Sequence, residues 1–174
     1  MNTFTASASV LLASLALVAC DGGTPAHLAA APGGLPAGLV VRGPAKGTDV
    51  AAAKGSARQG ETITVVGRIG GSEEPFVADR AVFTIVDPAL KACSDMDEPD
   101  HCKTPWDYCC EDRAKMRAGT ATVEIAGTDG RPLALSVRGM SGLDPLATVA
   151  VTGKVIERND AGVLVIRAER IEVR

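Results

Sequence analysis

Short extended segments with alternating side chains fill the chain from residue 61 to residue 173, and they restrict the fold more than any other feature. In residues 61–69, ETITVVGRI, Ile63, Val65, Gly67 and Ile69 share one face of a strand. The same kind of pattern predicts strands over 81–87, 120–126, 148–157 and 163–173, and residues 132–138 resume it after a turn. Turn residues separate these runs, which indicates an all-β domain.

Two of the predicted strands share a glycine motif. Val65-x-Gly67-x-Ile69 in the first strand matches Val151-x-Gly153-x-Val155 in the fourth. A glycine inside a strand often marks a bend or a close approach of two backbones. We therefore expect a small closed barrel in which the first and fourth strands pair.

The strand spacing, the GRI and GKV motifs and the C-terminal run GKVIERNDAGVLVIRAERI together resemble the oligonucleotide/oligosaccharide-binding (OB) fold. The resemblance covers residues 61–173 and implies a five-stranded barrel. The family places a helix between its third and fourth strands, and residues 139–146 are too short for a full one. An immunoglobulin-like sandwich is the alternative, although it would need about seven strands. OB-fold members bind nucleic acid, sugars, haem or protein, so the fold alone gives no function.

The N-terminal segment has the features of a targeting signal. Residues 10–19, VLLASLALVA, are apolar but too few to span a bilayer, which takes about 20 residues. The run ends in LVAC, which resembles the lipobox of bacterial lipoproteins, and the resemblance implies that Cys20 carries the lipid. The segment before the run holds no Lys or Arg, a departure from the positively charged start of such signals.

These features divide the chain into a signal peptide (1–19), a lipid-anchored flexible linker (20–56) and an OB-like domain (57–174). Ala, Gly and Pro dominate the linker, so it has little apolar surface to bury. Within it, residues 39–41, LVV, could add a short strand or contact.

A cysteine-rich insertion at 88–119 separates the second and third predicted strands. A loop this long usually has a function or is held in place by its own cross-links. Disulfides persist in the oxidising compartment beyond the membrane, so we expect two among Cys93, Cys102, Cys109 and Cys110. Adjacent cysteines would bridge only in a strained ring. Two pairings then remain, either Cys93–Cys109 with Cys102–Cys110 or Cys93–Cys110 with Cys102–Cys109.

Metal binding and thiol redox chemistry are the alternatives for these cysteines. Four thiolates and His101 could ligate zinc or an iron–sulfur cluster. The spacing C-x8-C-x6-C-C lacks the C-x2-C unit of common zinc sites, so we expect neither a metal site nor another cofactor.

The insertion also holds the candidate binding residues Trp106, Tyr108 and His101. Trp and Tyr are frequent anchors of binding surfaces. Alternatively, the two aromatic side chains cover the disulfides and close one barrel end. The acidic residues between 95 and 100 are expected to form a solvated loop.

Neither catalysis nor nucleic-acid binding is indicated. The sequence contains no G-x-S-x-G, H-E-x-x-H or P-loop motif, so we assign no catalytic residue and expect no enzyme. The net charge is −3, and aromatic residues are 3% of the chain, which argues against nucleic acid as a partner. We expect a membrane-tethered binding or assembly module of the cell envelope, facing the periplasm or the exterior. Its partner would be an envelope protein or a small ligand.

Substituting Cys20→Ala should release the protein from membranes, because the lipid is attached through that thiol. Cell fractionation followed by immunoblotting measures the change. Recovery of the unsubstituted protein from the cytosol with an intact N-terminus would contradict the lipoprotein hypothesis.

Overall fold

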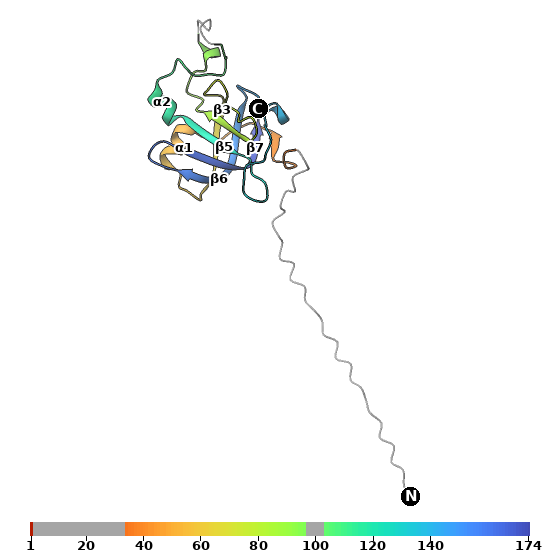
Figure 1. Cartoon of the computed structure of the whole chain (residues 1–174). Helices are drawn as coiled ribbons and strands as arrows, with labels where there is room; N and C mark the ends of the chain where they lie inside the picture. Colours follow the sequence, from red (N-terminus) through yellow and green to blue (C-terminus); the bar gives the residue numbers. More distant parts are fainter. Residues whose placement is uncertain (2–33, 97–102) are drawn as a thin grey trace.

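The computed structural model describes Met1 and residues 34–96 and 103–174. Figure 1 shows crossing strands with α1 and α2 together on one side. In chain order the elements are β1 (Val40–Arg42), β2 (Thr48–Asp49), α1 (Val50–Ser56), β3 (Thr62–Ile69), β4 (Val82–Val86), the 3₁₀ turn η1 (Cys93–Asp95), α2 (Arg113–Ala118), β5 (Thr120–Glu124), the 3₁₀ turn η3 (Met140–Gly142), β6 (Thr148–Arg158) and β7 (Leu164–Val173).

Strands β3 to β7 close into a barrel. The antiparallel pairs are β3–β4, β4–β5, β6–β7 and β3–β6, and β5 pairs in parallel with β7. Following these pairs from β3 through β4, β5, β7 and β6 leads back to β3. The structure thus confirms the five-stranded OB-fold-like barrel and excludes the two-sheet sandwich.

The two glycine-containing strands pair as the sequence predicted. Val65 lies opposite Val151 in the β3–β6 ladder. Gly153 lies where the register of β6 against β7 shifts, and a Cβ there would stand 2.1 Å from the carbonyl oxygen of Arg167. This close backbone approach requires glycine at position 153.

Aliphatic and phenylalanine side chains fill the barrel interior. The rings of Phe76 and Phe83 pack with their centroids 5.8 Å apart. Burial of such side chains is the main favourable term in folding. The buried strand residues of this core include Val65, Ile69, Phe83, Ile85, Val123, Val149, Val151, Val155, Leu164, Ile166 and Ile171.

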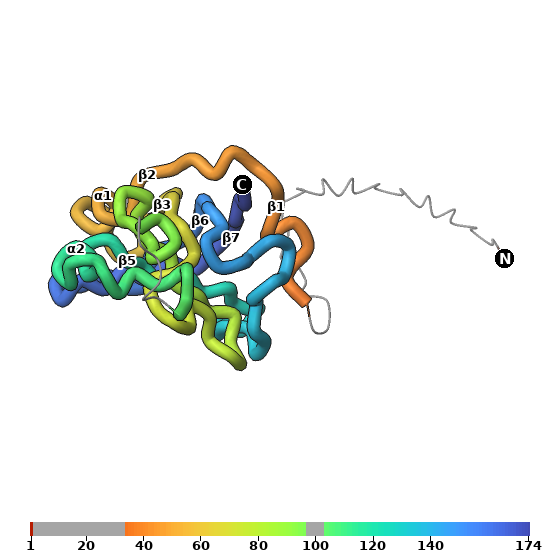
Figure 2. The backbone as a smooth tube through the Cα atoms, turned by 90° about the horizontal axis from the view of Figure 1, so that it is seen from above, coloured from red at the N-terminus to blue at the C-terminus, as the bar shows by residue number. Residues whose placement is uncertain are grey.

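The prediction of a flexible linker over 20–56 is wrong for the residues that the structure describes, from 34 on. Strand β1 pairs with the end of β7, and β2 pairs with the middle of β3. Figure 2 shows this segment passing from β7 to β3. The short strands β4 and β5 leave parts of β3 and β7 unpaired, and β1 and β2 supply those hydrogen bonds. The expected strand at 39–41 is confirmed as β1.

The linker prediction failed because the side chains that this segment buries are mostly small. Leu39, Val50 and Ala53 are 3%, 0% and 3% exposed and belong to the barrel core. Helix α1 packs on β3 and β5. A segment with little apolar surface can still fold when it completes a core that other strands build.

Asp87, directly after β4, ties α1 to the barrel. Its carboxylate is 4% exposed and accepts hydrogen bonds from the backbone N–H of Ala51 (2.8 Å) and of Ala89 (2.9 Å). The first N–H groups of a helix have no partner within the helix, so a remote carboxylate can satisfy one of them.

The extended segment predicted over 132–138 is not a strand. Only one isolated bridge, Ala126–Pro132, forms there. Both edges of β5 are already occupied by β4 and β7. The segment instead packs Leu133, Leu135 and Val137 against the barrel core. Between β5 and β6 only η3 forms, as the short connection predicted. In the described part of the chain, no helix has the length and apolar character to cross a membrane.

Replacing the buried carboxylate by Asp87→Ala should lower the free energy of unfolding by about 1–3 kcal/mol, because the N–H groups of Ala51 and Ala89 lose their acceptor. Equilibrium urea unfolding measures the change. Asp79→Ala, at an exposed position, is the control and should stay within about 0.5 kcal/mol of the unsubstituted protein. Equal stabilities of the two variants would contradict this role of Asp87.

Candidate functional site: the cysteine loop

The predicted insertion lies between β4 and β5, and Figure 1 shows its described residues at one end of the barrel, with α2 on the side. Its two arms are joined by backbone hydrogen bonds, from Cys93 N to Asp107 O (2.7 Å) and from Ser94 N to Pro105 O (3.0 Å). Its two ends meet where Asp87 N donates to Gly119 O (2.8 Å). We call residues 88–119 the cysteine loop. Cys102, His101 and the acidic residues from 97 to 100 lie outside the described residues.

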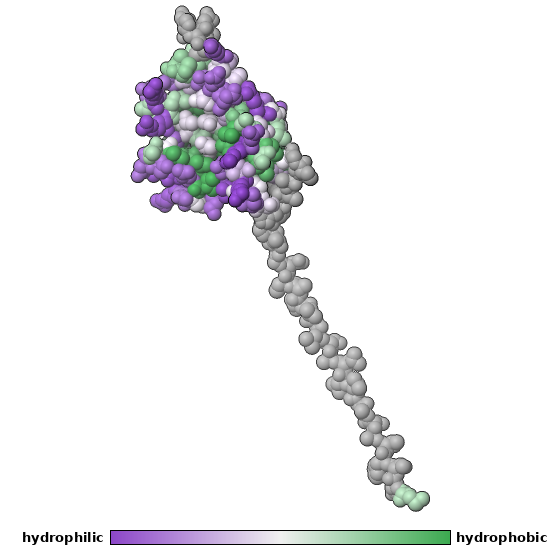
Figure 3. Space-filling view, in the orientation of Figure 1, coloured by the Kyte–Doolittle hydropathy of each residue, from purple (hydrophilic) through white to green (hydrophobic). Residues whose placement is uncertain are grey.

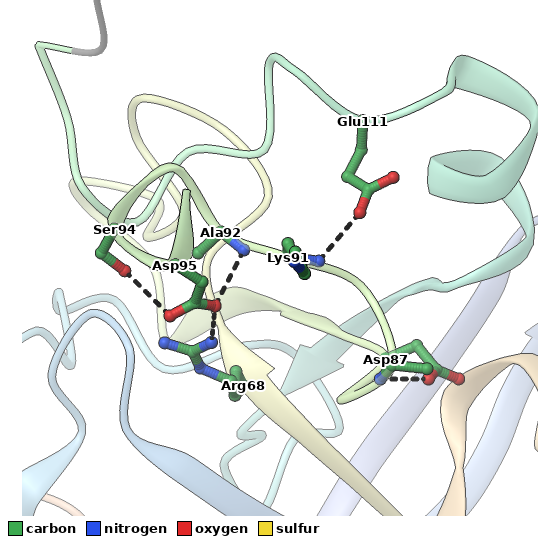
Figure 4. Close-up of polar contacts among 8 residues, drawn as sticks. Arg68, Asp87, Lys91, Ala92, Ser94, Asp95 and Glu111 are labelled. Carbon is green, nitrogen blue, oxygen red and sulfur yellow. Dashed lines mark hydrogen bonds and ion pairs between the residues drawn. The ribbon is translucent and has the colours of Figure 1, made fainter. Parts of the chain in front are cut away.

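An ion pair attaches the cysteine loop to the barrel. The guanidinium of Arg68, on β3, donates to the carboxylate of Asp95, which also accepts from Ala92 N at 3.1 Å (Figure 4). The Arg68 hydrogen bond is the main cause that holds the pKa of Asp95 below its ordinary value of 3.8. Nearby, Lys91 N donates to a carboxylate oxygen of Glu111 at 2.9 Å (Figure 4).

Three of the four predicted cysteines come together. The Sγ atoms of Cys93 and Cys109 are 3.4 Å apart, those of Cys109 and Cys110 are 4.0 Å apart, and all three lie within 4.8 Å of one another. Cys93 is buried, and the other two are exposed. None of these described pairs is at the S–S bond length of about 2.05 Å. The disulfides therefore stay a prediction, and the shortest separation favours the pairing that joins Cys93 to Cys109.

Tyr108 is a core residue. Its side chain is 2% exposed and forms a second apolar cluster with Val86 and Ala92, against which Leu90 and Leu146 pack. Burial raises the pKa of its phenol, and the hydroxyl has no hydrogen-bond partner among the described residues. This position agrees with the alternative that Tyr108 plugs the barrel end, and it leaves the side chain no surface with which to contact a partner.

Trp106 is partly exposed, and three contacts fix its position. Its indole N–H donates to Glu73 O at 2.9 Å, and its carbonyl accepts from Gly71 N at 3.1 Å. The Arg138 guanidinium carbon lies 5.2 Å from the ring centroid, a cation–π distance. Arg138 also pairs with Glu74 at 3.5 Å. We call Trp106, Arg138 and Glu74 the tryptophan face.

A hollow away from the cysteine cluster was not predicted from the sequence. It lies between α1, α2 and the β6–β7 turn, and its walls include Lys54, Arg113, Arg117 and Arg158. These residues are dispersed along the chain, so no local motif marks them. The sequence contains no continuous basic run that would indicate such a site.

Comparisons with known proteins leave the function open. No protein-family model and no curated protein matches the chain. A structure similar to this one is that of the hypothetical protein YgiW from E. coli, which is 16% identical. The likeness covers 77% of this chain and 97% of that chain, with a TM-score of 0.37. A similarity this distant does not bear on function, and the fold assignment stands on the strand pairing itself.

The depressed pKa of Asp95 predicts a pH effect on the cysteine loop. A carboxyl whose pKa is lower in the folded protein stabilises the fold above its unfolded pKa, about 4, and this stabilisation disappears as the pH falls through the folded value. Arg68→Gln should therefore move the Asp95 titration midpoint upward, toward 3.8. Carbon NMR of the Asp95 carboxyl measures it. Arg138→Gln, at a different ion pair, is the control, and an unchanged midpoint in Arg68→Gln would refute the assignment.

Proposed function

We propose that this protein is a lipid-anchored module of the cell envelope that binds a protein partner through the tryptophan face and catalyses no reaction. The LVAC sequence at the end of the apolar run supports the anchor at Cys20. The closed barrel supports a rigid binding scaffold, since OB-like barrels commonly serve in recognition. The anchor predicts a location on the periplasmic or outer side of a membrane.

The proposed anchor would keep the barrel near the membrane. The folded domain begins no later than Leu39, because the side chain of this residue is buried in the core. Even fully extended, residues 21–38 would reach at most roughly 65 Å. A partner in the same membrane, or one attached to it, would therefore meet the barrel at a high local concentration.

The observation that carries the binding proposal is the fixed, partly exposed indole of Trp106 beneath the guanidinium of Arg138. Trp and Arg dominate the hot spots of protein interfaces, because each brings a large contact area together with a polar group. The indole hydrogen bond to Glu73 O fixes the ring before a partner arrives, and the bond from Gly71 N to the Trp106 carbonyl fixes the backbone that carries it. A fixed side chain loses less conformational entropy on binding.

The tryptophan face can be tested by photo-crosslinking in cells. A photoreactive residue in place of Glu74 should give a defined adduct in the envelope fraction, and Trp106→Ala should abolish that adduct. A photoreactive residue at Lys154, an exposed position on β6, is the matched control and should not give the same adduct. Absence of an adduct at position 74, or its persistence in Trp106→Ala, would contradict the proposal.

A metal site on the cysteine loop is the second candidate function, and the convergence of three sulfur atoms favours it. With Zn–S bonds of about 2.3 Å, tetrahedral geometry places two thiolates about 3.8 Å apart. The Sγ separations of 3.4 Å (Cys93–Cys109) and 4.0 Å (Cys109–Cys110) lie on either side of that value. In such a site Cys93, Cys109 and Cys110 would supply three of the ligands.

Elemental analysis of the purified protein separates this candidate from the disulfides. A metal site predicts about one zinc per chain, which a chelator removes and Cys109→Ser with Cys110→Ser abolishes. The disulfide prediction instead requires metal-free protein whose cysteines react with an alkylating reagent only after reduction. Metal-free protein with reactive thiols before reduction would refute both.

A further inference from the structure

The basic hollow between α1, α2 and the β6–β7 turn has the size of a small-molecule site. Its volume is about 630 Å³, within the usual range for ligand pockets of roughly 300–1,000 Å³. In Figure 3 the side of the molecule where α1 and α2 lie shows mostly hydrophilic residues, with paler and apolar residues toward the middle of the view. Small side chains, including Ala51, Ala114, Ala118 and Val163, line part of the hollow and leave its space open.

Positive charge is concentrated in this hollow although the whole chain carries −3. Four cationic side chains line it, against one carboxylate, that of Asp160. Asp160 is already paired with Arg158 at 3.1 Å. Within residues 34–96 and 103–174, neither Arg113 nor Arg117 has a carboxylate oxygen within 4.0 Å.

Two of the four cationic side chains, those of Lys54 and Arg158, hold the walls of the hollow together. Lys54 Nζ donates to the Arg117 carbonyl at 2.5 Å, which ties the end of α1 to the end of α2. The Nε and Nη2 atoms of Arg158 both lie 3.4 Å from the Lys54 carbonyl and donate to it. The Arg117 stem lies so close to the turn that a Cβ at Gly162 would be 2.8 Å from its Cγ. These contacts set the shape of the hollow and leave the guanidinium groups of Arg113 and Arg117 for a ligand.

Lys54 would also be stabilised by a bound anion. Burial lowers the pKa of its ammonium, because a charge loses hydration when it leaves water. An anion near Nζ would compensate for that loss. Arginine guanidinium groups also match the oxygens of a phosphate in geometry, with paired N–H donors.

We propose that this hollow binds a phosphate group, with Arg113 and Arg117 as its direct donors and Lys54 adding positive charge. The small apolar residues around it accept the rest of a phosphate-bearing ligand. That ligand is either a soluble phosphate ester or the headgroup of an anionic phospholipid, and the chemistry at the guanidinium groups is the same for both. The inference does not depend on the lipid anchor or on the tryptophan face.

The test uses the full-length chain with Cys20→Ala, so that no attached lipid contributes to binding. Pyrophosphate is titrated and followed by amide NMR shifts at Ala114, Ala118 and Gly162. Arg113→Gln with Arg117→Gln should bind at least about tenfold more weakly, because the variant loses the charge-assisted hydrogen bonds of both guanidinium groups. Lys46→Gln with Lys154→Gln removes the same charge at exposed positions outside the hollow and should bind as the parent does.

Vesicles distinguish the two ligand sources. Phosphatidylglycerol vesicles should pull down the parent chain and not the Arg113/Arg117 variant if a headgroup is the ligand, with phosphatidylcholine vesicles as the neutral comparison. Pyrophosphate binding without selective vesicle binding assigns a soluble ligand. The proposal is overturned if pyrophosphate shifts none of the three amides, or if both double variants lose affinity equally. Thermal unfolding of each variant shows that it remains folded.

Discussion

Pairing along β7 is the constraint on which the rest of the structure depends. One edge of β7 pairs with β6 along almost its whole length, and the other edge is shared by β5 at its start and β1 at its end. The parallel β5–β7 ladder, with Thr122 opposite Val165, converts an open sheet into a barrel. Closure leaves no long unpaired edge, so the barrel needs no partner strand to satisfy its backbone.

The short partners of this closed barrel explain the elements around it. Strand β4 pairs with only the last residues of β3, and β5 pairs with only the first residues of β7. The segment from β1 to α1 occupies the remaining parts, and Asp87 secures α1 where β4 ends. The same arrangement brings α1 beside α2, and the basic hollow forms between them. The hollow is thus a consequence of how the barrel completes its hydrogen bonds.

Local periodicity was sufficient to predict the barrel strands, because each one alternates along its own length. The pairing of the first and fourth strands was predicted from the glycine motif they share, and the structure adds the register, with Val65 opposite Val151. The order of residues 34–56 was missed because it depends on partners far along the chain, such as Val173 opposite Arg42. Residues 132–138 have the pattern of a strand, but both edges of the preceding strand, β5, are occupied by β4 and β7. The cations of the hollow come from α1, α2 and the end of β6, and only the fold brings them together.

The cysteine cluster and the basic hollow are close in the chain but mechanically separated. Only Glu111 and Asp112 lie between Cys110 and Arg113, and a separate hydrogen bond holds each of their carboxylates. Glu111 accepts from Lys91 N at 2.9 Å, and Asp112 accepts from Ala114 N at 2.8 Å as the N-cap of α2. A change at the sulfur atoms would have to break these bonds before it moved Arg113. Because the barrel fixes both ends of the cysteine loop, its sulfur chemistry and the phosphate affinity of the hollow should vary independently.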